Sequence, residues 1–179
     1  MQIKLTATPE DHHIAKMAAL AIGLSVAEAA IPSPLPGIKP GLANIITLLV
    51  LQRYGLRSAI WVSLLRVVAG SLILGTFLSP SFALSLSGAL LSLVALACMQ
   101  LLPKRLFGPV THSIFASFAH ITGQLAIVYL WLIPHAGIAY LIPIFAAAAL
   151  LFGTVNGLIA AQLLATKEPD FTQPQSSIV

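Results

Sequence analysis

The sequence predicts an all-α, polytopic membrane protein with six transmembrane helices and both termini in the cytoplasm. Three observations lead to this prediction. Hydrophobic residues make up 58% of the 179 residues and charged residues only 8%, against about 25% charged residues in ordinary soluble domains. The charges gather between long apolar runs. These runs are continuously apolar, unlike the short alternating strands of a membrane barrel.

The first predicted helix is the apolar run over residues 12–31. Its length suits a transmembrane helix, which needs about 20 residues, but its short apolar core also resembles that of a cleaved signal peptide. The acidic residues Glu10 and Asp11 stand directly before it. They favour the helix, because signal peptides begin with a positively charged segment.

The second predicted helix, residues 41–54, is shorter and follows a loop, residues 31–41, that contains four prolines. At 1.5 Å per residue this helix spans roughly 21 Å, less than the roughly 30 Å hydrocarbon layer. We therefore expect the loop to dip below the outer surface and to bound an outward-facing pocket, since non-helical backbone at membrane depth must be buried in protein or line a cavity. A tilted helix in locally thinned lipid is the alternative.

Four further runs have the length of a membrane span and cover residues 56–77, 81–102, 110–133 and 137–164. Cytoplasmic loops of membrane proteins keep an excess of Lys and Arg. Lys39 is the single cation on one side of the predicted bundle. The other side holds seven: Lys4, Lys16, Arg53, Arg57, Lys104, Arg105 and Lys167. This bias places both termini in the cytoplasm and Lys39 outside.

The chain is predicted to form one membrane domain with a tail at each end. Residues 1–11 and 166–179 are polar and contain proline, so we expect them to be mobile cytoplasmic tails. Residues 12–165 form the six-helix transmembrane domain. The predicted location is the cytoplasmic (inner) membrane of a bacterium.

Glu28 and Arg66 are the acid and base that lie well inside apolar runs. Ionisable residues in a membrane span are costly and therefore functional candidates by default. Glu28 lies near the outer end of the first helix, and the long stem of Arg66 lets its guanidinium reach toward that side. The two form either a structural ion pair between helices or a ligand site in which Arg66 binds an anionic group through two hydrogen bonds.

Lys39 and Asn44 form a second candidate site, at the start of the second helix. The first backbone N–H groups of a helix have no partner within it and carry the positive end of its dipole, which together favour an anion. Taken singly, Lys39 is more often a solvated loop cation, and Asn44 a residue that makes a hydrogen bond between helices.

The fifth run carries polar residues on one helical face. They stand at spacings of 4, 3 and 4 residues: Ser113, Ser117, His120 and Gln124. Such spacing places them on one side of a helix, which must point away from lipid. With Arg66 this face would wall a polar cavity in which His120 and Gln124 bind a ligand. For the two serines, packing between helices is the simpler interpretation.

Small residues recur at every fourth position along the first helix, at Ala15, Ala19, Gly23 and Ala27. Such a ridge allows close approach of another helix. A similar ridge lies on the sixth run at Gly153, Gly157 and Ala161. Both could serve internal packing, but the length and regularity of the first ridge leave a partner helix from another subunit open.

Signatures of enzymes are missing from the sequence. Asp occurs only at positions 11 and 170, so an aspartate-rich magnesium site for diphosphates cannot be built. There is also no phosphate-binding loop, no zinc-ligand spacing and no nucleophile elbow. We therefore expect a protein that is not itself an enzyme and that holds no metal and no cofactor. ATP hydrolysis, if it drives this protein, must come from another subunit.

Several segments resemble a bacterial membrane family that is named both the Gx transporter family and heptaprenyl diphosphate synthase component I. The resemblance covers nearly all of the hydrophobic part. It rests on Pro36 to Ile45, Leu64-Leu65-Arg66, Gly75 to Ser81, Leu84 to Gly88, and His120 with Gly123-Gln124. Pro40 is a minor departure, because an apolar residue is expected there.

The family is similar to the substrate-binding S components of energy-coupling-factor vitamin importers. This similarity implies a six-helix membrane protein that binds its ligand near the outer face. It also implies that a small-xxx-small motif on the first helix, here Ala15, Ala19 and Gly23, packs against a membrane coupling subunit that works with ATPases.

Two functional hypotheses follow from the sequence. In the first, the protein is a membrane-embedded substrate-binding subunit that captures a small anionic or amphipathic ligand with Lys39, Asn44, Arg66, His120 and Gln124. In the second, it is a non-catalytic accessory subunit of an isoprenoid (heptaprenyl diphosphate) synthase or of a membrane redox or flavin system. A proton-coupled carrier would need a longer titratable relay than Glu28 and His120 provide. Nothing in the sequence suggests nucleic acid as a partner.

Overall fold

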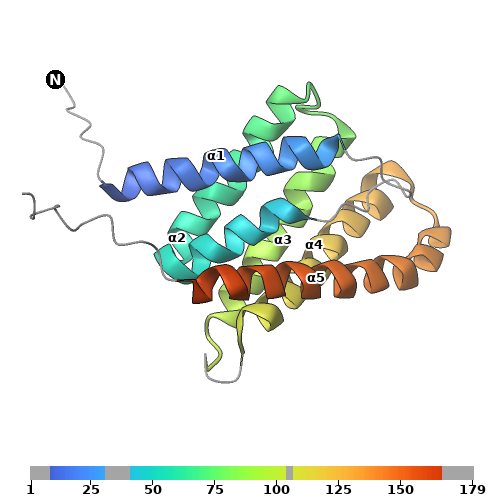
Figure 1. Cartoon of the computed structure of the whole chain (residues 1–179). Helices are drawn as coiled ribbons and strands as arrows, with labels where there is room; N and C mark the ends of the chain where they lie inside the picture. Colours follow the sequence, from blue (N-terminus) through green and yellow to red (C-terminus); the bar gives the residue numbers. More distant parts are fainter. Residues whose placement is uncertain (1–8, 31–40, 104–106, 167–179) are drawn as a thin grey trace, which may run out of the picture.

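The computed structural model describes residues 9–30, 41–103 and 107–166. All regular secondary structure in these ranges is helical, which confirms the all-α prediction. The elements, in chain order, are α1 (Pro9–Ala29), α2 (Leu42–Ile73), α3 (Pro80–Met99), α4 (Pro109–Ile127), the π-helix η1 (Val128–Leu132), the 3₁₀ helix η2 (Ala136–Leu141) and α5 (Ile142–Ala165). Figure 1 shows how they lie together in one bundle.

Helix α2 consists of two helical segments that meet at Gly55. The backbone there has φ 85° and ψ 178°, a region that glycine enters readily and residues with a side chain avoid. Figure 1 shows the sharp turn between the two halves of α2. The predicted helices 41–54 and 56–77 therefore correspond to the two halves of this element.

Four helices in the described part are long and apolar enough to cross a membrane. They cover Leu42–Ile73, Pro80–Met99, Pro109–Leu132 and Ala136–Ala165, as expected of a multi-pass membrane protein. Helix α1 is not among them, and it carries both Lys16 and Glu28. The arrangement with six spans and two cytoplasmic termini stays a prediction. Most of the predicted tails, residues 1–8 and 167–179, lies outside the described residues.

Prolines and a serine mark where the helices begin. Helix α3 starts at Pro80, and the side chain of Ser79 before it accepts a hydrogen bond from the N–H of Phe82 at 3.4 Å. Helix α4 starts at Pro109. Proline fits the first turn of a helix because its missing N–H would have no partner there, and serine is a favoured cap.

The helices pack as neighbours in sequence: α1 chiefly on α2, α3 on α4, and α4 on α5, with smaller contacts of α2 with α3 and α5. Buried positions hold many small and polar residues, including Ala21, Ala59, Ser63 and Ser92, beside large apolar ones such as Leu51. Many large apolar side chains lie on the outside instead. This distribution fits a bundle in lipid, where small residues let helices approach closely and leucines face the acyl chains.

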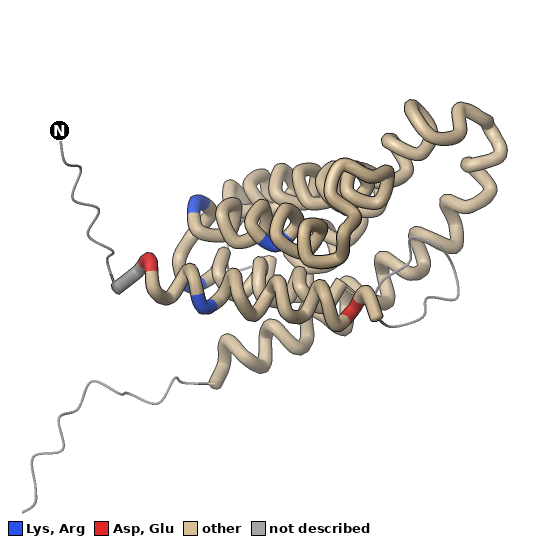
Figure 2. The backbone as a smooth tube through the Cα atoms, turned by 90° about the horizontal axis from the view of Figure 1, so that it is seen from above, with Lys and Arg blue, Asp and Glu red and all other residues tan. Residues whose placement is uncertain are grey.

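Charged residues are sparse along the described helices, and Figure 2 shows long stretches of the bundle without any. Among the Asp, Glu, Lys and Arg residues of the described part, Glu28 and Arg66 are the ones that are buried, at 6% and 7% exposure. Because burial of a charge in a membrane protein is costly, the surroundings of these two residues define the candidate site.

Candidate functional site

The carboxylate of Glu28, near the end of α1, holds the start of α2. Its Oε1 accepts hydrogen bonds from the N–H of Gly41 and, at 3.2 Å, from the N–H of Leu42. Gly41 is the N-cap of α2 and has no side chain that could do this. The first N–H groups of a helix lack partners within it, and a carboxylate also matches the positive end of the helix dipole.

The start of α2 lies deep in the bundle. The carbonyl of Gly41 accepts a hydrogen bond of 3.2 Å from Nδ2 of Asn156 on α5. From Ile142 to Asn156, α5 rises about 20 Å at 1.5 Å per residue, so this contact is far from the end of a candidate span. Whether the chain before α2 dips below the outer surface, as the short second helix led us to expect, stays a prediction. The loop itself, residues 31–40, lies outside the described residues.

Arg66, His120 and Gln124 form a polar cluster between α2 and α4. Nε2 of Gln124 lies 3.3 Å from Nε2 of His120, and His120 is near enough to Arg66 for the two to interact electrostatically. The Nε of Arg66 is buried and has no hydrogen-bond partner in the described part. Nδ1 of His120 is buried as well and has no hydrogen-bond partner among the described residues.

Gly88 and Gly123 make room for this cluster. A Cβ at Gly88 would come within 2.8 Å of the His120 ring, and one at Gly123 within 2.6 Å of the carbonyl oxygen of Ser87. Helices α3 and α4 therefore touch backbone to backbone, with the imidazole laid across α3. Both glycines belong to the segments that carry the family resemblance, but their role as contact points requires the packed structure.

The predicted site residues thus separate into two groups. Arg66, His120 and Gln124 lie together, whereas Asn44 lies near Gly41, with its Nδ2 3.2 Å from where a Cβ of Gly41 would stand. Lys39 lies outside the described residues. The N–H groups that we expected to bind an anion beside Lys39 and Asn44 are engaged by Glu28.

The predicted pair of Glu28 and Arg66 takes a different form. The charges are near enough to interact electrostatically, but the hydrogen bonds that the structure gives Glu28 go to the backbone of Gly41 and Leu42. The carboxylate of Glu28 thus caps the start of α2 and makes no direct hydrogen bond to Arg66 among the described residues. Sequence reasoning also missed Asn156, although an amide in the middle of the apolar sixth run was a visible signal.

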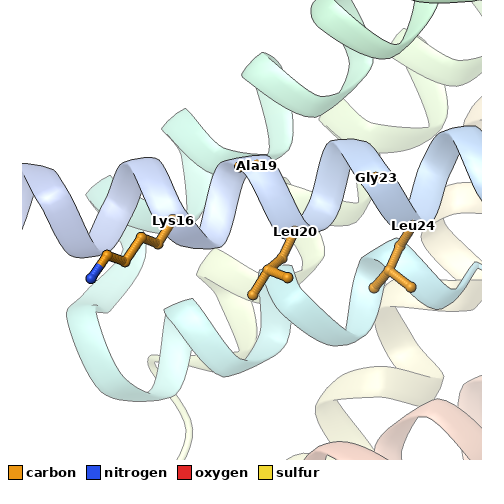
Figure 3. Close-up of a pocket in the computed structure, with 5 residues that line it drawn as sticks. All are labelled: Lys16, Ala19, Leu20, Gly23 and Leu24. Atoms are coloured by element: carbon orange, nitrogen blue, oxygen red, sulfur yellow. The ribbon is translucent and has the colours of Figure 1, made fainter.

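Two hollows are lined by described residues. One is an apolar groove of about 650 Å³ along α1, lined by Lys16, Ala19, Leu20, Gly23 and Leu24, which Figure 3 shows from the side of the two leucines. The other is a cavity of about 10 Å³ between α2, α3 and α4, with Asn44 in its wall. Neither hollow has Arg66, His120 or Gln124 in its lining.

The two ridges of small residues have different surroundings. Ala15, Ala19, Gly23 and Ala27 are all exposed, and nothing lies within 4 Å of where a Cβ of Gly23 would stand. On α5, a Cβ at Gly157 would lie 2.7 Å from Cα of Val110 on α4. The ridge of α5 therefore serves internal packing, whereas no described residue covers the ridge of α1 at Gly23.

Comparison with known proteins gives one match. A sequence model of the family described as heptaprenyl diphosphate synthase component I matches residues 17–163, which is most of the chain and all but the ends of the helical bundle. No curated protein matches the sequence, and no solved structure matches the fold.

Proposed function

The chain belongs to the heptaprenyl diphosphate synthase component I family, and on this premise we propose that it is a non-catalytic membrane subunit that captures a small anionic or amphipathic ligand from the outer side. The observation that supports this proposal is the buried guanidinium of Arg66, whose Nε has no hydrogen-bond partner in the described part. The location we propose is the cytoplasmic membrane of a bacterium.

A buried guanidinium without full hydrogen bonding is unfavourable, because it has lost water without gaining enough partners. A carboxylate or phosphate group would supply the missing acceptors, and guanidinium binds such groups through two parallel hydrogen bonds. His120 and Gln124 lie beside it and offer further hydrogen bonds. The cluster therefore has the chemistry of a site for an anionic group.

The route to this cluster would start at the outer surface. The start of α2 is tied to α1 through Glu28 and to α5 through Asn156, and we propose that it forms the inner end of this route. We propose that Lys39, which lies outside the described residues, and Asn44, in the first turn of α2, guide the anionic ligand inward. In this proposal Glu28 holds the start of α2 in place.

Replacing Arg66 with Gln tests the proposal. Small molecules that co-purify with the protein from its own membranes would be extracted and quantified by mass spectrometry. Hydrogen bonds to a charged group contribute about 1.5 to 3 kcal/mol, so we expect the R66Q variant to retain roughly 10 to 150 times less of the bound compound. The matched control is R57Q, because Arg57 lies on the same helix but is exposed. Equal retention by R66Q and the unchanged protein would refute the proposed site.

The exposed ridge on α1 supports a partner helix. The similarity to S components implies that such a ridge packs on a membrane coupling subunit, and the groove beside Ala19 and Gly23 offers the close approach that small residues allow. We therefore propose a membrane coupling subunit with ATPases as the partner that moves the ligand-loaded protein.

Replacing Gly23 with Leu tests this contact. The side chain would enter open space within the protein itself, so G23L should fold and melt like the unchanged protein but lose the co-purified partner. The control is A147L, which makes a similar change at an exposed position of α5. If G23L retains the partner as well as A147L does, the ridge is not the contact surface.

A second candidate function is favoured by the family description itself. The family is described as component I of a synthase, which implies an enzyme as partner and fits a non-catalytic accessory subunit in an isoprenoid-synthesising or redox complex. The proteins that co-purify through the α1 ridge distinguish the two candidate functions. An ATPase pair with its coupling subunit supports ligand uptake, whereas a prenyltransferase or a flavoprotein supports the accessory role.

A further inference from the structure

Three helices enclose a small cavity that shares only Asn44 with the proposed function. It has a volume of about 10 Å³ and lies between α2, α3 and α4. Five of its eight lining residues carry a hydroxyl or an amide group: Asn44, Thr47, Ser92, Ser113 and Ser117. Ser113 and Ser117 belong to the polar face of α4 that continues to His120 and Gln124.

The hydroxyl of Thr47 is the group that points to a ligand. Thr47 is 5% exposed and lines the cavity, and its Oγ1 has no hydrogen-bond partner within the described residues. Other hydroxyls on these helices donate to a carbonyl one turn back, as Ser58 of α2 does to Tyr54 at 3.2 Å and Thr122 of α4 to Phe118 at 2.8 Å. Thr47 does not make this usual bond, so its hydroxyl needs a partner inside the cavity.

We propose that this cavity binds one ordered water molecule, which bridges Thr47 of α2 to the polar side chains of α3 and α4. A cavity holds a water molecule when about 10 to 15 Å³ of its volume is open to the centre of a sphere of water size, and the water then needs two to four polar partners. The cavity meets both conditions. Water-mediated hydrogen bonds are nearly as favourable as direct ones, so the site would join three helices at a place where their side chains do not reach one another.

A monovalent cation of similar size is the competing occupant. The lining contains no carboxylate that could offset the loss of the ion's hydration shell. This lining favours a neutral ligand.

Hydroxyl-radical footprinting by X-ray irradiation tests the water site, because radicals formed from a bound water modify the side chains next to it. Leu48 and Leu96 line the cavity, whereas Leu51 lies on α2 outside the lining. All three are almost fully buried, at 3%, 2% and 2% exposure. We expect Leu48 and Leu96 to be modified several-fold faster than Leu51 in the unchanged protein, and this excess to be lost in T47V, which keeps the shape but removes the hydroxyl.

Two results would overturn the proposal. One is equal modification of the three leucines in the unchanged protein, which requires no variant. The other is a melting temperature that is higher in NaCl than in choline chloride for the unchanged protein but not for T47V, because it assigns the cavity to a cation. If T47V does not fold, S92A provides the second variant, since Ser92 lines the same cavity from α3.

Discussion

Replacing Gly123 with Ala should destabilise the folded protein by about 1 to 3 kcal/mol, the usual cost of inserting a methyl group into a filled contact. The new Cβ would lie 2.6 Å from the carbonyl oxygen of Ser87 and 2.9 Å from its carbonyl carbon. Both are backbone atoms of α3, so no side chain can turn away, and α3 and α4 must separate. The His120 ring, which lies on Gly88, would shift with them.

The measurement is the melting temperature in detergent, followed by loss of the monodisperse peak after heating. For a protein of this size the expected decrease is about 2 to 12 °C. The control is G23A, where the new Cβ meets open space and alanine favours the helix over glycine by about 1 kcal/mol. G23A should melt at the same temperature or slightly higher. A G123A variant that melts like G23A would contradict the close contact of α3 and α4.

Much of the helical framework could be predicted from sequence, because length and hydropathy act along the chain itself. The run at 81–102 appears as α3, Pro80–Met99, and the predicted break near Arg53 and Arg57 appears as the turn at Gly55. Helix α1 forms as expected, but with His12, His13, Lys16 and Glu28 in its sequence it falls outside the helices that qualify as spans. Helix formation and membrane crossing are separate properties. A segment of mixed polar and apolar residues such as α1 can form a helix without being apolar enough to qualify as a membrane span.

The two clusters of polar residues differ in how far sequence could predict them. His120 and Gln124 share a helical face, and a polar face in lipid must turn toward another polar group, so their meeting with Arg66 followed from spacing. The hydrogen bonds of Glu28 to the start of α2 could not be predicted from spacing. Its partners are backbone N–H groups of Gly41 and Leu42, and every residue except proline has such a group, so no residue type reveals that a helix starts at that place.

The small-residue ridges also show that sequence spacing alone does not predict helix packing. Gly153 and Gly157 on α5 lie against α4, while Gly23 on α1 faces open space, although the spacing of four residues is identical in both. Spacing determines which residues share a face. Whether that face is covered depends on where the other helices lie, which is a property of the whole bundle.

Replacing Glu28 with Ala should have the largest effect of any single change in the described part. The partly buried N–H groups of Gly41 and Leu42 would lose their acceptor, at up to about 1 to 3 kcal/mol each. The start of α2 lies deep in the bundle, where water cannot easily replace the carboxylate. Arg66 would also lose the anion that interacts with it electrostatically. We expect E28A to be folded poorly or not at all in detergent.

The variant E28Q separates the two contributions of Glu28. Glutamine keeps an oxygen that can accept the same N–H groups but lacks the charge, and neutral hydrogen bonds are roughly half as strong as charge-assisted ones. If capping of α2 dominates, E28Q should recover most of the melting temperature that E28A loses, and hydrogen exchange at Leu42 should stay slow. If E28Q is as unstable as E28A, the electrostatic attraction to Arg66 dominates instead, and the double variant E28Q/R66Q should then be more stable than E28Q alone. If capping dominates, E28Q/R66Q should instead be less stable than E28Q alone. The second substitution would then add its own cost without restoring an acceptor to Gly41 and Leu42.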